Sequence, residues 1–145
     1  MKRIILILVV MFMLVVGVEA RNAETDKYLD GAIAEATAKF PYRIDSTTIF
    51  TGVNREDNIV YFEYQLFGVA QIDGESYDID AYFKSPMNRV VFIQVARENL
   101  VRLGCVDANS RFIIDKDYII RKVFYNRNDK FLFYLELDKH MCRNK

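Results

Sequence analysis

Residues 103–142 read LGCVDANSRFIIDKDYIIRKVFYNRNDKFLFYLELDKHMC and hold the only two cysteines of the chain, Cys105 and Cys142. Two apolar and aromatic runs, residues 112–125 and 131–137, lie between the cysteines and are separated by a short polar turn. Alternating apolar residues on both sides of a polar turn are typical of a β-hairpin. We therefore predict the end of a helix, then a β-hairpin, and a disulfide that joins the two.

The N-terminus has the layout of a secretory signal peptide. A basic start is followed by the uncharged apolar residues 4–18, and small residues precede the predicted cleavage between Ala20 and Arg21. The apolar run is shorter than the ~20 residues that a membrane span needs, so an uncleaved anchor is only the alternative. We predict a signal peptide over residues 1–20, one domain over residues 21–145, and a periplasmic or secreted protein without a stable membrane span.

The charge balance argues against a nucleic-acid partner. The chain has 20 basic and 20 acidic residues, a formal net charge of +0, and no long basic arm. Nucleic-acid-binding domains usually carry a clustered positive field. We therefore expect no nucleic acid among the partners.

Two cysteines in an exported chain predict a disulfide between Cys105 and Cys142. Closing a loop of this length stabilises the folded state by roughly 3 to 4 kcal/mol, mainly through the unfolded chain. The alternative is two unrelated thiols, one of them buried.

Two amphipathic helices are expected. Apolar residues recur at three- and four-residue steps over residues 21–40, and Pro41 ends that pattern. Ser85 is a suitable cap for a second helix over residues 85–103, because proline follows it in the first turn. Gly104 stands where a left-handed C-cap is expected.

The remaining segments favour strands. Residues 42–53 are rich in β-branched side chains, and residues 59–69 alternate in polarity. Residues 77–83 predict a third strand, with a short helix as the alternative, and residues 106–111 are expected to form a polar connection. This order predicts an α+β fold: an antiparallel sheet of four to five strands with two main helices packed on one face, and one disulfide.

No set of residues points to catalysis, a cofactor or a metal. His140 is the only histidine, and both cysteines are assigned to the disulfide, so a metal centre or a thiolate nucleophile lacks ligands. The acidic pairs Asp78 with Asp80 and Asp115 with Asp117 lack the remainder of a calcium loop. We expect a protein that is not an enzyme and binds no cofactor.

Aromatic residues are abundant: the chain has nine tyrosines and eleven phenylalanines but no tryptophan. Several lie on strand positions opposite the set that we expect to face the core. Tyrosine is enriched at protein interfaces, where its ring packs and its hydroxyl stays hydrogen-bonded. We predict Tyr61, Phe67 and Tyr125 as partner contacts, with packing under helices as the alternative.

The segment bounded by the cysteines resembles the α/β class of type II secretion pilotins. The entry into the first strand, residues 40–45, is also similar. The residues that carry the resemblance are Cys105, Tyr118, Leu137, Asp138 and Cys142. The resemblance implies a sheet flanked by helices that binds the C-terminal segment of a secretin. Pilotins of this class are typically lipoproteins, whereas this chain has no cysteine before Cys105.

These observations predict an exported, non-enzymatic module of the bacterial envelope that binds another envelope protein, such as a secretin. A groove between helix and sheet, or an exposed strand edge, is the expected binding mode. The first alternative is a periplasmic inhibitor or immunity-type protein that blocks an enzyme with the loop of residues 126–130. The second alternative is a small hydrolase or ligand carrier, which would need a pocket lined by converging polar groups.

Overall fold

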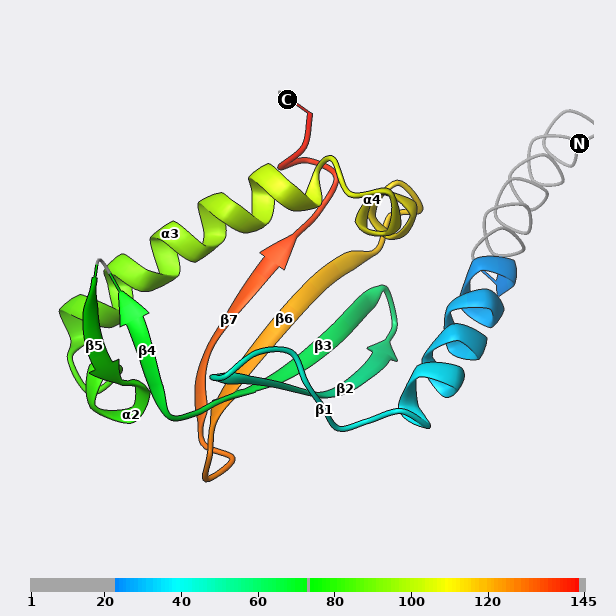
Figure 1. The fold of residues 1–145 in the computed structure, drawn as a ribbon. Coiled ribbons are helices and arrows are strands. Elements are labelled where there is room, and N and C mark those ends of the chain that lie inside the picture. The colour runs from blue at the N-terminus through cyan, green and yellow to red at the C-terminus, as the bar shows by residue number, and fades with distance from the viewer. Residues whose placement is uncertain (1–22, 73, 144–145) are drawn as a thin grey trace, which may run out of the picture.

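The computed structural model describes residues 23–143 with the exception of residue 73 (Figure 1). The predicted signal peptide and its cleavage site, Ala20 and Arg21, lie outside these residues. Within the described part, no helix is both long enough and apolar enough to cross a membrane.

A five-stranded sheet forms the centre of the fold, in the order β1-β2-β3-β6-β7. The strands are β1 (Tyr42–Arg43), β2 (Thr48–Glu56), β3 (Ile59–Leu66), β6 (Ile119–Asn126) and β7 (Phe131–Leu137). The α+β class is confirmed, and so is the β6–β7 hairpin. The sheet is mixed, however, because β3 and β6 pair in parallel. Between these two strands the chain leaves the sheet and crosses back over it, so it enters β6 in the direction of β3.

The crossing segment contains two strands and three helices. These are β4 (Val69–Ile72), β5 (Glu75–Asp78), α2 (Ile79–Tyr82), α3 (Pro86–Gly104) and α4 (Ala108–Ile114). β4 and β5 form a separate two-stranded sheet.

Side-chain caps decide where these helices begin, and two of them correct the sequence-based expectations. The carboxylate of Asp78 accepts a hydrogen bond from the Ala81 N–H, which ends β5 and starts α2 inside residues 77–83. Asp107 accepts from the N–H of Ser110, so a helix follows where we expected only a polar connection. A carboxylate at this position satisfies an N–H that the helix itself cannot.

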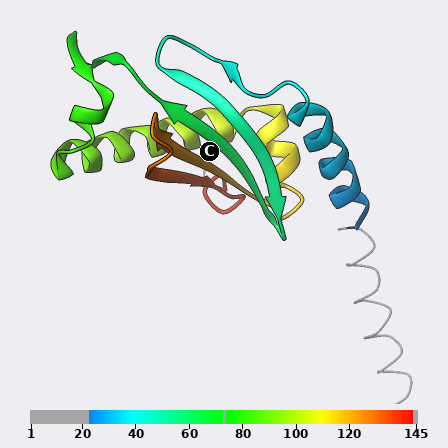
Figure 2. The same ribbon diagram turned by 90° about the horizontal axis from the view of Figure 1, so that it is seen from below.

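Three helices cover one face of the sheet: helix 23–37, α3 and α4 (Figures 1 and 2). Helix 23–37 and α3 were expected from the sequence. Under α3 the core is formed by Leu66, Ile79, Phe83, Phe133 and Leu135. Under α4 it is formed by Ile114, Ile120, Leu137 and Cys142, and under helix 23–37 by Leu29, Val60 and Tyr118. No helix of the described chain packs on the other face, which we call the open face.

The predicted disulfide is present. It joins Cys105, the C-cap of α3, to Cys142 beyond the end of β7, with a Cα–Cα distance of 5.4 Å. The expectation for Gly104 was wrong, since its φ is not positive and it is the last residue of the helix. A Cβ on Gly104 would lie 2.5 Å from the Leu137 Cδ2, so glycine allows α3 to approach β7 closely.

Helix 23–37 is attached to the sheet by a polar cluster. The Arg55 guanidinium forms two hydrogen bonds with the Asp30 carboxylate, at 2.9 and 3.0 Å, and lies 3.2 Å from Asp26. The hydroxyl of the buried Tyr118 donates to the same Asp26. Burial, and then this bond, raise the pKa of Tyr118 to about 12.

This raised pKa predicts a loss of stability in alkali. An unfolded tyrosine ionises near pH ~10, so between about pH 10 and pH 12 only the unfolded chain releases this proton, and the free energy of unfolding falls as pH rises. We expect Tyr118→Phe to flatten this fall, measured as urea unfolding against pH. Burial also raises the pKa of Tyr64 to about 12. We therefore expect Tyr64→Phe to flatten the fall in the same way. An unchanged slope in both variants would contradict the assignment.

Candidate functional site

The open face brings together two of the three aromatic residues predicted as partner contacts. Tyr61 on β3 and Tyr125 on β6 line one shallow hollow of about 340 Å³. Its other lining residues are Asn54, Glu56, Glu63, Arg121, Val123, Phe131 and Tyr134. The third residue, Phe67, does not line it. It follows β3, its N–H donates to the Thr47 carbonyl, and its ring lies under the Arg43 guanidinium at 4.8 Å.

Several polar groups of the open-face hollow are already bonded within the chain. Arg121 is hydrogen-bonded to Glu136 at 2.7 Å through Nε, and its guanidinium lies 5.4 Å from the Tyr61 ring and 5.0 Å from the Tyr134 ring. Asn54 donates to Glu63 at 3.2 Å. This surface offers aromatic area, but its one cation is neutralised inside the chain.

A second surface lies on the helix-covered face, between α3, the start of α4 and the middle of the sheet. It is a groove of about 420 Å³, which we call the α3 groove. The lining residues are Ala96, Asn99, Leu100, Leu103, Gly104, Asp107, Ser110, Lys122, Phe124 and Leu135. Apolar side chains therefore form most of its wall and floor.

Helix α3, which lines this groove with Leu100 and Leu103, also exposes apolar side chains to solvent. Val91, Val95 and Leu103 are 50%, 52% and 54% exposed. They follow one another at four- and eight-residue steps, so they lie on one side of the helix. Next to them on α3, Phe92, Ile93 and Leu100 pack on the core. The helix thus has a buried apolar face and, beside it, an apolar stripe that no described residue covers.

Aromatic rings form the sheet surface next to the groove. Phe50, Tyr64, Phe124 and Phe133 come from four adjacent strands and stack in sequence, with centroid distances of 4.9, 5.1 and 4.6 Å. Stacked rings at these distances bury a large area and hold one another in place. Phe124, the one member of this stack that lines the groove, is therefore held in place by its neighbours.

Lys122 is charged, whereas its neighbours on the inward-facing side of β6 are apolar. It lies between Ile120 and Phe124 on the helix-covered face, half-buried, with its Nζ 5.9 Å from the centre of the Tyr64 ring. Burial lowers the pKa of this amine, while the Asp107 carboxylate acts in the opposite direction. The sequence signal was available, because a lysine interrupts the apolar set Ile120, Lys122, Phe124, but we did not single it out.

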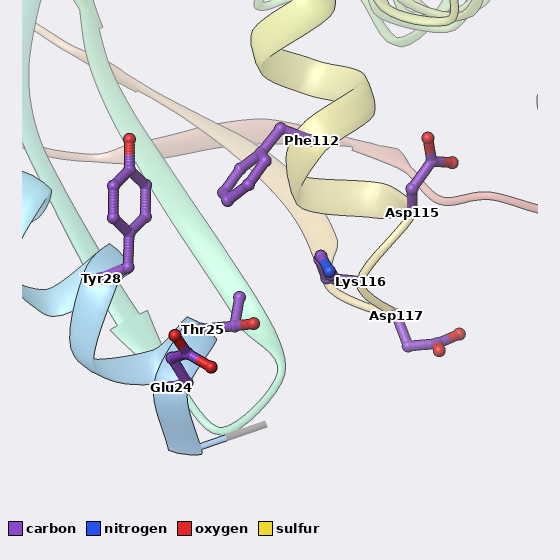
Figure 3. Close-up of a pocket in the computed structure, with 7 residues that line it drawn as sticks. All are labelled: Glu24, Thr25, Tyr28, Phe112, Asp115, Lys116 and Asp117. Atoms are coloured by element: carbon purple, nitrogen blue, oxygen red, sulfur yellow. The ribbon is translucent and has the colours of Figure 1, made fainter. Parts of the chain in front are cut away.

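Another hollow, of about 750 Å³, lies between helix 23–37 and α4 (Figure 3). The Tyr28 and Phe112 rings meet edge to face across it, 5.3 Å apart. The Asp115 and Asp117 carboxylates point away from Glu24 in Figure 3, so its acidic groups do not converge. In the described part of the chain, no three His, Cys, Asp or Glu side chains are placed to hold a metal ion.

The loop proposed for an inhibitor is a tight turn held by its own residues. The Asn126 side-chain oxygen accepts from the N–H groups of Asn128 and Lys130, at 2.9 and 3.0 Å. Asp129 adopts a positive φ of 57° and accepts from the Gln65 side chain. These asparagine and aspartate residues are accounted for by turn formation.

Comparison with known proteins identifies the fold. No protein-family profile and no curated protein sequence matches the chain. A solved structure of PA3611 from Pseudomonas aeruginosa, a protein inferred to be secreted, is similar, with a TM-score of 0.65, 15% identity, and coverage of 85% of this chain and 96% of that one. The pilotin EpsS of the Vibrio vulnificus type 2 secretion system is similar with a TM-score of 0.58 at 14% identity, covering 86% and 97%. The chain therefore shares the fold of a pilotin, as the resemblance in residues 103–142 predicted.

Proposed function

We propose that this chain is an exported, non-enzymatic docking protein of the bacterial envelope, which holds a segment of another envelope protein in its α3 groove. The observation that carries the proposal is the exposed apolar surface of α3, formed by Val91, Val95 and Leu103, which continues into the groove where Leu103 and Phe124 line it. An uncovered apolar surface of this kind, next to a formed groove, is typical of sites that take a partner's apolar face. The pilotin-like fold supports a secretin subunit as the first partner to test.

The α3 groove supports this function better than the open face does. In the open-face hollow Arg121 is already bonded to Glu136. The groove instead has an apolar wall on α3 and a charged group, Lys122, that forms no ion pair within the described residues. Tyr61, Phe67 and Tyr125 remain a prediction for a second contact surface.

Site-specific photocrosslinking in cells tests the proposal. We expect a photoreactive phenylalanine analogue at Val95 or Leu103 of the full chain to form a covalent adduct with a secretin subunit, because these side chains would lie in the interface. Mass spectrometry identifies the adduct. The matched control is the same analogue at Val106, which is more exposed than either residue but lies beyond the end of α3.

The same experiment separates the two surfaces. Adducts from Tyr61 or Tyr125 with none from Val95 or Leu103 would assign docking to the open face. If no position captures an envelope protein, the proposed function is wrong.

A further inference from the structure

Lys122 carries a positive charge into the α3 groove without an anion bonded to it. Among residues 23–72 and 74–143, no carboxylate lies within ion-pair distance of its Nζ, which lies 5.9 Å from the centre of the Tyr64 ring. The amine is also partly removed from water, and this burial lowers its pKa. A charge that has lost hydration without gaining a partner raises the free energy of the free protein.

The one carboxylate near the groove is engaged elsewhere. Asp107 caps α4 and accepts from both the N–H and the hydroxyl of Ser110, each at 2.8 Å. These two bonds lower the pKa of Asp107. Its negative charge acts on Lys122 only through space, so the amine keeps its three donor positions for another acceptor.

The ordinary role for a lysine at such a place is to cover an apolar surface with its carbon chain while the amine reaches water. That role accounts for contact with Tyr64, but it does not account for the groove around the amine. Phe124 and Leu135 on the floor and Leu100 on the wall are apolar. A carboxylate that entered beside them would meet a cation that is already desolvated, where a charge-assisted hydrogen bond is strong.

The backbone around Lys122 determines the form of the occupant. β6 is paired with β3 on one side and β7 on the other, so the floor offers no free strand edge, and an extended peptide laid there would leave its own backbone groups without partners. A helix satisfies its backbone internally and can lay an apolar face against Leu100, Leu103 and Phe124.

We propose that the occupant of the α3 groove is an amphipathic helix that presents a carboxylate within its apolar face, and that Lys122 is the counter-ion that selects it. This inference rests on the proposed function for the location of docking and adds the chemistry of the partner. Apolar contacts with α3 provide the area, and the ion pair provides the preference. A buried charge pair discriminates mainly because the wrong partner leaves one charge unpaired.

The test uses two synthetic amphipathic helical peptides that differ in one residue, glutamate or glutamine, at the centre of the apolar face. Binding to the full mature protein is measured by fluorescence anisotropy. We expect the glutamate peptide to bind at least about tenfold more tightly, as one hydrogen bond to a charged group would give. Lys122→Met should bind both peptides alike, and Lys122→Arg should keep the preference.

The control variant is Lys130→Met, which removes an exposed lysine from the β6–β7 turn and should leave the preference unchanged. Thermal unfolding of Lys122→Met checks the fold, and we expect it to be at least as stable as the natural protein, since a desolvated charge is replaced by an apolar group. Equal binding of the two peptides by the natural protein, no binding of either, or a preference that survives in Lys122→Met would overturn the inference. A glutamate preference without a secretin adduct in cells would instead contradict only the proposed partner.

Discussion

Removing the disulfide is expected to lower the free energy of unfolding by about 3 to 4 kcal/mol. The bond closes a loop of 37 residues that contains α4, β6 and β7. Without it the unfolded chain has more conformational entropy, which favours unfolding. Urea unfolding of the oxidised protein, the reduced protein and Cys105→Ala/Cys142→Ala measures the effect. The denaturant midpoint should fall, and the urea dependence should steepen because an open unfolded chain exposes more surface.

The reduced protein is the control that separates the cross-link from packing. Cys142 is buried beside Ile114 and Leu137, so the alanine variant also loses sulfur contacts, whereas the reduced protein keeps them. We expect the reduced protein to account for most of the loss. Equal midpoints for oxidised and reduced protein would show that the disulfide does not stabilise this fold.

The predictions from the sequence were most accurate for elements that nearby residues determine. The β6–β7 hairpin follows from two alternating runs around Asn126, whose side chain organises the turn. The start of α3 follows from Ser85, which caps the helix as expected. α4 was missed because its signal is a single cap, Asp107 with Ser110, in a stretch that reads as polar.

Features that depend on distant residues were not predictable in the same way. The parallel pairing of β3 with β6 joins Tyr61 to Arg121, and nothing local to either strand specifies it. Gly104 was assigned to a turn geometry, whereas its role is a contact with Leu137 in another element. The open-face aromatics were predicted from alternation within single strands. The sequence shows that Lys122 interrupts an apolar set, but its position in a groove depends on which face of the sheet the helices cover.

Replacing Leu137 by alanine is expected to cost about 2 to 5 kcal/mol of stability. The side chain is 0% exposed and belongs to the cluster of Ile114, Ile120 and Cys142 beneath α4. Because its neighbours come from a helix, a strand and the disulfide, they cannot easily collapse into the cavity. Leu103→Ala, on the exposed stripe of α3, is the matched control and should change the free energy of unfolding by less than about 0.5 kcal/mol.

The contact between Leu137 and Gly104 gives this prediction a sharper form. A methyl group at Gly104 would lie 2.5 Å from the Leu137 Cδ2, so Gly104→Ala alone should destabilise by about 1 to 3 kcal/mol through overpacking. In the double variant the new methyl enters the space that Leu137→Ala vacates. The double loss should therefore be smaller than the sum of the single losses by about 1 kcal/mol or more, measured in a double-mutant cycle. Additive losses would mean that α3 and β7 are not held together at this contact, and the groove beside it would then lack a fixed wall.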